Sequence, residues 1–138
     1  MTDFNEWNAH VIDEFRANGG KVEAFPANNL ILLHHTGAKS GQERVSPLAY
    51  QPVDGGYAIF ASKGGSPENP AWYHNLQANP KATIEIGTET FPVIARVAGP
   101  EEREPIWARQ KQAQPGFAEY EQKTSRQIPV VILEPARD

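Results

Sequence analysis

Apolar residues near the start of the chain recur at the spacing of one helix face, at Phe4, Trp7, Val11 and Phe15. Gly19-Gly20 stands where such a helix would end. The pattern predicts that residues 1–20 form an N-terminal amphipathic helix, regular over residues 3–18. Because no basic polar face accompanies the apolar stripe, we expect it to dock on the protein's own core. Peripheral contact with a membrane or a partner is the less favoured alternative.

Three short runs with strand character follow this helix. They cover residues 30–35, 44–51 and 57–62. A glycine-containing loop joins the first run to the second, and the turn signal Asp54-Gly55-Gly56 joins the second to the third. The sequence therefore predicts three consecutive antiparallel strands.

A second helix and a hairpin are predicted next. Asn69 and Pro70 have the chemistry of an N-cap and a first helical residue, and Asn79-Pro80 would end the helix. Two segments then alternate apolar and polar positions around Gly87-Thr88, which predicts a hairpin with an exposed tip. These segments span residues 82–86 and 89–97. The second of them has four apolar residues on one face, Phe91, Val93, Ala95 and Val97.

The C-terminal part of the chain is predicted to hold two helices and a final strand. Gly99-Pro100 opens the first helix, and Pro105 is expected to confine its regular part to the region around and after the first turn. A short helix begins at Pro115, and the last strand spans residues 128–133. Six short strands interrupted by helices, without strict β-α-β alternation, predict a mainly antiparallel β fold with helical additions (α+β), arranged as a barrel.

Composition narrows the class of protein. The length of 138 residues fits one domain over residues 1–138, and the absence of cysteine excludes a disulfide framework or a thiolate site, so redox chemistry would need a bound cofactor. The chain begins without a signal-peptide pattern and has no transmembrane run, from which we expect a cytoplasmic protein. A net charge of -4 argues against nucleic acid as a partner.

Two glycine-rich loops carry cations that could bind an anion. The first contains Lys39 and Arg44, and the second contains Lys63 beside Ser62. Glycine lets backbone N–H groups turn toward a ligand, and Lys or Arg adds charge-assisted hydrogen bonds, so phosphate or carboxylate is the expected ligand. Neither loop has the spacing of a Walker A loop or of a dinucleotide fingerprint. A solvated surface loop is the alternative interpretation.

Other kinds of site find less support in the sequence. His34 and His35 are adjacent in a predicted strand and would point to opposite faces, so they cannot share one metal ion, and we expect no metal site. No Gly-x-Ser-x-Gly motif indicates a serine hydrolase. Four aromatic residues could stack on a planar ligand, although aromatic residues at helical spacing more often belong to the core. They are Trp72, Tyr73, Phe117 and Tyr120.

Three runs, in this order, closely resemble the deazaflavin-dependent nitroreductase family, and the likeness spans nearly the whole chain. They are Leu32–Leu48, Ala61–Gly65 followed by Asn69–Pro80, and Arg126–Pro135. The family has a split β-barrel fold related to FMN-binding reductases. Its members bind coenzyme F-420, an 8-hydroxy-5-deazaflavin (hereafter F420). The resemblance therefore implies a split β-barrel that binds F420.

The resemblance also implies which residues bind the cofactor. Lys39 and Arg44 would hold the phosphate of F420, and Lys63 would contact its anionic tail or the phosphate region. Pro47 and Leu48 would lie along the deazaflavin ring. Four further positions would complete the site: Asn69, Trp72 and Asn75 on the following helix, and Ser62 near the reacting end.

The implied reaction is hydride transfer from the reduced deazaflavin to a planar, electron-poor small molecule, which could be a quinone, an activated enone or a nitroaromatic, with quinone-like acceptors ahead of nitroaromatics. Tyr120 is a candidate proton donor. The chain departs from nitroimidazole-reducing members at Ala49, Gln114 and Phe117, so an altered acceptor pocket is expected. A non-catalytic carrier of deazaflavin or an apolar ligand, and an FMN-dependent reductase, are the alternatives. Both a monomer and a homodimer remain open.

Overall fold

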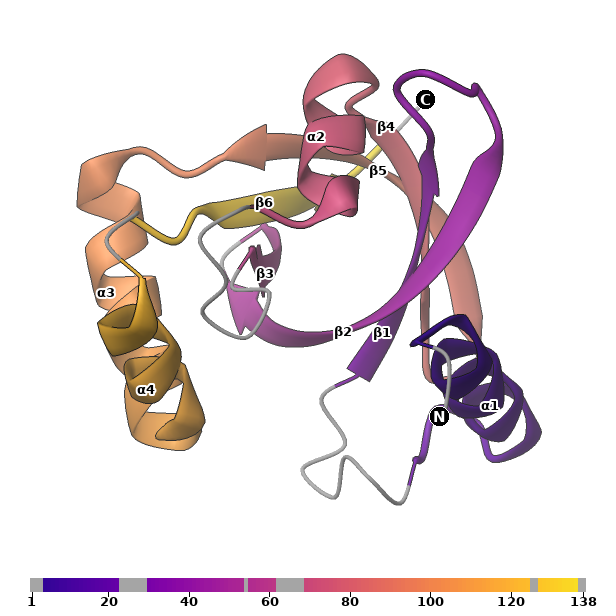
Figure 1. Cartoon of the computed structure of the whole chain (residues 1–138), viewed down its shortest axis with the longest axis horizontal. Coiled ribbons are helices and arrows are strands. Elements are labelled where there is room, and N and C mark those ends of the chain that lie inside the picture. The colour runs from indigo at the N-terminus through magenta and orange to yellow at the C-terminus, as the bar shows by residue number, and fades with distance from the viewer. Residues whose placement is uncertain (1–3, 23–29, 54, 62–68, 125–126, 137–138) are drawn as a thin grey trace.

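The computed structural model describes residues 4–22, 30–53, 55–61, 69–124 and 127–136, and Figure 1 shows the helices and strands that they form. In chain order they are α1 (Phe4–Ala17), β1 (Leu30–Thr36), β2 (Glu43–Val53), β3 (Gly56–Phe60), α2 (Ala71–Ala78), β4 (Lys81–Ile86), β5 (Glu89–Val97), α3 (Pro100–Ala113), α4 (Gly116–Lys123) and β6 (Val130–Pro135).

The six strands close into one antiparallel barrel in the order β1-β2-β3-β6-β5-β4. Every neighbouring pair in this order is antiparallel, which confirms the predicted fold class. Closure pairs β1 with β4 and so covers strand edges that could recruit another chain, except along part of β2. None of the described helices is long and apolar enough to span a membrane.

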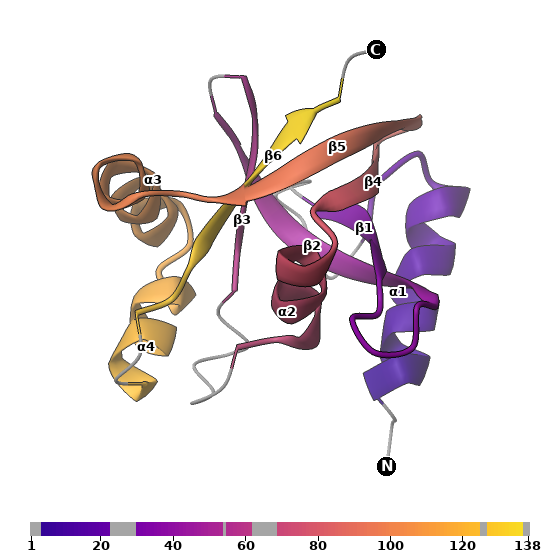
Figure 2. The ribbon, with the colours of Figure 1, turned by 90° about the horizontal axis from the view of Figure 1, so that it is seen from above.

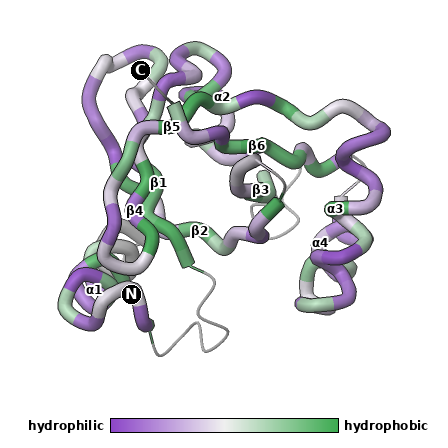
Figure 3. The backbone as a smooth tube through the Cα atoms, turned by 180° about the vertical axis from the view of Figure 1, so that it is seen from behind, coloured by the Kyte–Doolittle hydropathy of each residue, from purple (hydrophilic) through white to green (hydrophobic). Residues whose placement is uncertain are grey.

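The helices occupy three different places around the barrel. Helix α1 lies on one side of it and the α3–α4 pair on the other, while α2 lies between them (Figures 1 and 2). Val11 and Phe15 of α1 pack on Leu30 and Leu32 of β1, as the apolar stripe predicted. The strands β1 and β6 are coloured as hydrophobic over much of their length, β1 on the side of α1 and β6 nearer to α3 (Figure 3). They are buried because helices cover the sides that face away from the barrel interior.

The barrel interior is filled by side chains from most strands and from α2. Ile31 and Leu33 of β1 belong to this cluster, and Trp72 and Leu76 of α2 join it. A second cluster lies outside the barrel, where α3 and α4 pack on β3 and β6. It contains Phe60, Ile106, Trp107, Ile128 and Ile132, with Phe117 and Tyr120 at its margin.

Strand β2 changes its partner halfway along. Its first part, residues 43–49, pairs with β1, and its last part, residues 50–53, pairs with β3. Within the described residues, therefore, no strand pairs with the second edge of residues 43–49. Pro47 lies in this part, which suits a residue that has no N–H to donate and is tolerated only where a strand has a free edge.

Two glycines meet where α1 ends. Gly20 has a φ of 96°, and a Cβ built on it would lie 2.8 Å from Cα of Gly87 in the β4–β5 turn. Neither a side chain nor an ordinary L-residue conformation fits at Gly20. The chain after α1 is thereby held against the tip of the β4–β5 hairpin.

Several predicted boundaries need correction. Pro70, not Asn69, is the N-cap of α2, since its ψ of 156° leaves it extended, and α4 likewise starts one residue after the predicted Pro115. Helix α3 is continuous through Pro105 because the carbonyl of Glu101, which loses its helical partner there, is on an exposed turn and can bind water. The last strand begins at Val130, two residues later than predicted.

Val97 alternates with Val93 and Ala95 along one face of β5, as predicted, but near the end of the strand it is 47% exposed. The four aromatic residues pack in the core, which the sequence favoured over a ligand wall. Trp72 and Tyr73 pack in the interior cluster, whereas Phe117 and Tyr120 pack in the α3–α4 cluster.

Candidate functional site

The loop that joins β1 to β2 is closed by its own backbone. The N–H of Gly37 donates to the carbonyl of Gln42 at 2.9 Å, and the N–H of Gly41 donates to the carbonyl of Gly37 at 2.9 Å. A Cβ on Gly37 would lie 2.5 Å from Oγ of Ser40, so a larger residue there would require the Ser40 side chain to move. This compact turn presents the predicted phosphate ligands at the end of the hairpin.

Lys39 and Arg44, the two predicted phosphate ligands, are both exposed. Among the described residues neither cation forms an ion pair or a side-chain hydrogen bond. Arg96, by contrast, is held by Glu102 and Glu134, at 2.6 and 3.1 Å. The charges at the hairpin end are therefore available to an anionic ligand, while that of Arg96 is already neutralised.

Asn75 connects this loop to α2 from a buried position. Its Oδ1 accepts a hydrogen bond from the N–H of Ala38 at 2.9 Å, and its Nδ2 lies 2.9 Å from Nδ1 of His35. His35 in turn places its Nε2 2.9 Å from Oγ of Ser46 in β2. One chain of polar contacts thus joins α2, the hairpin loop, β1 and β2.

His35 is neutral in this setting. Its side chain is only 3% exposed. Burial, together with the positive charge of Arg44 and the neighbouring His34, lowers the pKa of His35 to about 4. The ring can therefore accept a hydrogen bond at one nitrogen and donate at the other near neutral pH.

Residues 43–49 of β2, whose second edge has no strand partner among the described residues, lie next to this series of polar contacts. Ser46, Pro47 and Leu48 are all half-buried there. Successive side chains of a strand point to opposite faces, and Leu48 packs against the interior cluster, so Pro47 faces away from that cluster. The two residues predicted to lie along the ring therefore do not present their side chains to the same face.

The remaining predicted site residues fall in several places. Trp72 is buried in the interior cluster, and Asn69 is half-buried just before α2. Tyr120 packs on Phe117 with ring centroids 5.3 Å apart, in the α3–α4 cluster. Ser62 and Lys63 lie outside the described residues. The structure thus brings Lys39, Arg44, Asn75 and β2 together at one hairpin, and it places Tyr120 in a separate cluster.

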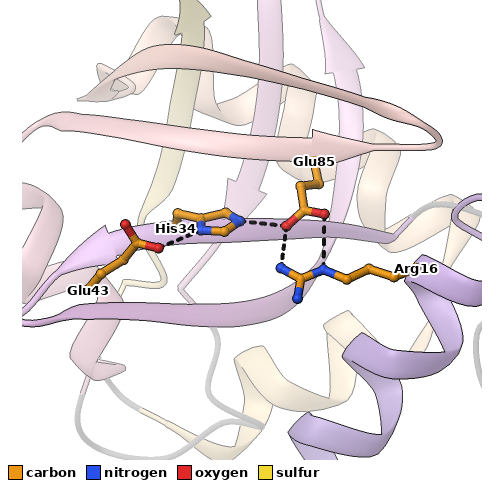
Figure 4. Close-up of polar contacts among 4 residues, drawn as sticks. All are labelled: Arg16, His34, Glu43 and Glu85. Carbon is orange, nitrogen blue, oxygen red and sulfur yellow. Dashed lines mark hydrogen bonds and ion pairs between the residues drawn. The ribbon is translucent and has the colours of Figure 1, made fainter.

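The outer face of β1 carries a different polar network (Figure 4). Nδ1 of His34 contacts Glu43 at 2.9 Å, and Nε2 contacts Glu85 at 2.5 Å. Arg16 of α1 donates from two nitrogens to the same Glu85, at 3.3 and 2.8 Å. The hydrogen bond from Arg16, aided by that from His34, lowers the pKa of the Glu85 carboxyl. These contacts fasten α1 to the barrel.

Sequence reasoning missed the roles of His35 and Ser46. It weighed His35 only as a metal ligand, and within the described residues no cluster of three or more His, Asp or Glu side chains is arranged to hold a metal. A signal was present in the sequence, because His35 alternates with Ile31 and Leu33 and so shares their buried face. A buried histidine requires polar partners, and Ser46 and Asn75 provide them.

A cavity of about 290 Å³ lies between α2, β5 and β6, away from the contacts of Asn75. Its walls include Tyr73, Leu76, Ala95, Val97 and Val131. It is lined by a different face of α2 from the one that carries Asn75, so it does not belong to the polar chain described above.

The closed six-strand antiparallel barrel, with helices on its outside, has the split β-barrel fold. Likeness in fold extends to a solved pyridoxamine 5′-phosphate oxidase-like protein of Listeria innocua, which is 10% identical with a TM-score of 0.57, over 79% of this chain and 85% of that one. More specifically, the chain belongs to the F420H(2)-dependent quinone reductase family, whose model matches residues 7–135.

Relatives support this membership at higher identity. An F420H(2)-dependent quinone reductase of Mycobacterium tuberculosis strain H37Rv is 44% identical over 120 residues, which cover 83% of this chain and 78% of that protein. A solved F420-H2 dependent reductase is 45% identical with a TM-score of 0.70, over 77% of this chain and 94% of that one. A solved domain-swapped dimer is 37% identical with a TM-score of 0.72, over 96% of this chain and 100% of that one.

Proposed function

We propose that this protein is an oxidoreductase that transfers a hydride from reduced F420 to a quinone-like small molecule. Membership of the F420H(2)-dependent quinone reductase family over residues 7–135 is the observation that carries this function. The same family resemblance, and the likeness to an F420-H2 dependent reductase of known structure, support F420 over FMN as the cofactor.

The residues at the β1–β2 hairpin fit an anionic deazaflavin. Lys39 and Arg44 are unpaired within the described residues and would hold the phosphate. Leu48 offers a half-buried apolar surface for a ring, and the second edge of residues 43–49 offers backbone groups without a strand partner. When bound, reduced F420 supplies the hydride.

The protein's own contribution to this reaction is to bind, orient and exclude water. Oδ1 of Asn75 accepts from the N–H of Ala38, which ties the loop that carries Lys39 to α2. Five further residues stay predicted cofactor contacts: Pro47, Ser62, Lys63, Asn69 and Trp72. Asn75 itself would then act on the cofactor through the loop as well as by any direct contact.

Tyr120 is the proposed proton donor to the reduced acceptor. It is half-buried, and Phe117 holds its ring. Loss of a general acid typically lowers a rate by about 100-fold or more. We expect Tyr120→Phe to lower turnover on that scale with little change in the F420 dissociation constant, and unchanged turnover would assign the proton to solvent.

The proposed function is tested first by binding and then by turnover. Titration of the purified protein with F420 and, in parallel, with FMN is expected to give micromolar or tighter binding for F420 alone. Reduced F420 is then mixed anaerobically with a soluble naphthoquinone or a nitroimidazole, and its absorbance is followed. We expect faster oxidation by the quinone. Binding without turnover on any acceptor would instead favour a carrier.

Two broader predictions concern the location of the protein and its oligomeric state. We propose a cytoplasmic location without a nucleic-acid partner, with peripheral contact with a membrane as the less favoured alternative; the net charge of -4 supports the absence of a nucleic-acid partner. A monomer and a homodimer are both compatible with the sequence, and a relative forms a domain-swapped dimer. Light scattering of the purified protein with and without F420 measures which of the two forms is present.

A further inference from the structure

The chain of contacts from Asn75 to Ser46 has only one consistent direction. The N–H of Ala38 can only donate, so the Asn75 atom that it meets must be the carbonyl oxygen Oδ1. The amide nitrogen of Asn75 must then face His35, at 2.9 Å from Nδ1. This assignment of the Asn75 amide follows from the backbone and does not depend on the state of the histidine.

The direction of the Asn75 amide fixes the tautomer of His35. Nδ1 accepts a hydrogen bond from Asn75 and therefore carries no proton, so the hydrogen of the neutral ring is on Nε2. That Nε2–H donates to Oγ of Ser46 at 2.9 Å. Burial of the ring, which is 3% exposed, favours this neutral form over an imidazolium.

Ser46 is left with a hydroxyl hydrogen to donate. Its oxygen already accepts from His35, and within the described residues the hydroxyl donates to no other group. Arg44, Ser46 and Leu48 alternate along one face of β2, in the part of the strand whose second edge has no strand partner. A hydroxyl donor whose oxygen is engaged by His35 thus stands between the proposed phosphate ligand and the apolar surface proposed for the ring.

We propose that Ser46 donates a hydrogen bond to an oxygen of the bound cofactor, between the phosphate and the ring, and that His35 and Asn75 are positioning residues that aim this hydroxyl. The inference rests on the proposed function, because the acceptor oxygen belongs to F420. It adds a ligand-binding residue and assigns Asn75 and His35 an action through Ser46.

The binding test compares two substitutions at one position. Ser46→Ala removes the donor and is expected to weaken F420 binding by about tenfold. Ser46→Thr keeps the hydroxyl and is expected to restore affinity to near the wild-type value. Thr90→Ala, which removes an exposed hydroxyl from β5, is the matched control and should leave the affinity unchanged. The melting temperature of each variant without cofactor separates weaker binding from a damaged fold.

The outcomes distinguish this contact from the proposed function as a whole. If wild-type protein binds F420 and Ser46→Ala binds it equally well, the contact is wrong and the function stands. If wild-type protein does not bind F420, both are wrong. A phosphate-free 8-hydroxy-5-deazaflavin locates the acceptor: an equal loss of affinity for this fragment places the oxygen on the ring side, and loss for F420 alone places it on the phosphate side.

The positioning role is tested on the protein without cofactor. Nitrogen-15 NMR of the histidine rings at pH 7 is expected to show His35 protonated on Nε2 and unprotonated on Nδ1. Asn75→Asp keeps an acceptor for Ala38 but can no longer donate to His35, so the proton should move to Nδ1 or the ring should become charged. Nδ1 protonation in the wild type, or an unchanged ring in Asn75→Asp, would overturn the positioning role.

Discussion

His34 and His35 are neighbours in β1, yet their side chains point to opposite faces and have different polar partners. His34 faces outward, where both ring nitrogens meet carboxylate oxygens, of Glu43 and Glu85, and Arg16 of α1 completes the network (Figure 4). His35 faces inward, where an amide and a hydroxyl surround a neutral ring. The alternation of a strand alone separates these two environments.

The charged network around His34 and the neutral contacts around His35 have different roles in this barrel. The outer network is charged and partly exposed, and it joins α1 to β1 and β4, so it should influence stability and respond to salt. The inner chain is uncharged and buried, and it sets the geometry of the hairpin loop and of Ser46. Changes on the inner side should alter ligand binding, and changes on the outer side should leave binding alone.

The largest expected effect concerns the cations that the inner chain positions. Replacing both Lys39 and Arg44 by alanine should weaken F420 binding by about 3–6 kcal/mol, at 1.5–3 kcal/mol for each charge-assisted bond. The melting temperature should hardly change, because both side chains are exposed and unpaired within the described residues. Fluorescence titration measures the affinity. Lys81→Ala is the control, and affinity equal to that of wild type in the double variant would contradict the phosphate site.

An intermediate effect is expected from the protonation of His35. Its pKa is about 4 in the folded protein and about 6.5 in an unfolded chain, so the unfolded state binds more protons between these values. Stability should be complete above pH 6.5 and should fall by up to about 3 kcal/mol as the pH drops toward 4. Urea unfolding at several pH values measures this.

Two comparisons assign this pH dependence to the inner histidine. His35→Gln should flatten the slope between pH 4 and 6.5, whereas His10→Gln, at an exposed position, should leave it unchanged. The lowered pKa of Glu85 also adds stability, but this part is lost only as the pH falls below the ordinary carboxyl range, through the lowered pKa. A slope that persists in His35→Gln would count against the neutral ring.

The smallest effect is expected on the outer face. Arg16→Ala removes the ion pair with Glu85, in which the side chains are 51% and 14% exposed, and should lower the free energy of unfolding by about 0.5–1 kcal/mol. The loss should shrink in high salt, and F420 affinity should stay as in the wild type. Arg109→Ala, at an exposed position on α3, is the matched control. Weaker cofactor binding in Arg16→Ala would show that the two faces of β1 are coupled.

Much of the fold could be predicted because local patterns and tertiary packing agree. The alternation along β4 and β5 and the turn glycines at residues 55 and 87 placed the strands correctly. Predictions of helix and strand bounds were wrong where a local sequence signal disagreed with the tertiary packing. Pro105 suggested a helix that is regular only around and after its first turn, but α3 is continuous from Pro100 to Ala113. Ile128 suggested a strand residue, but its side chain packs outside the barrel and its carbonyl accepts from Arg103.

The cations of the site could be predicted from the sequence, but the hydrogen bonds that connect its other residues could not. Lys39 and Arg44 stood out because cations beside glycines have a recognisable chemistry. The contact from His35 to Ser46 joins two strands, and Asn75 adds a helix 40 residues further along the chain. Such contacts depend on strand register and on how α2 enters the barrel, and neither can be derived from spacing within a single segment.

Because β2 changes its partner, the edge that a neighbouring strand covers switches along its length. Among the described residues, residues 43–49 pair with β1 alone and residues 50–53 with β3 alone, so each part has one edge without a strand partner. Amide hydrogens that point to the unpaired edge should therefore exchange with solvent much faster than their neighbours in the same strand. Hydrogen exchange along β2 would then read as alternating fast and slow positions up to Ala49, and a ligand seated on that edge would erase the alternation.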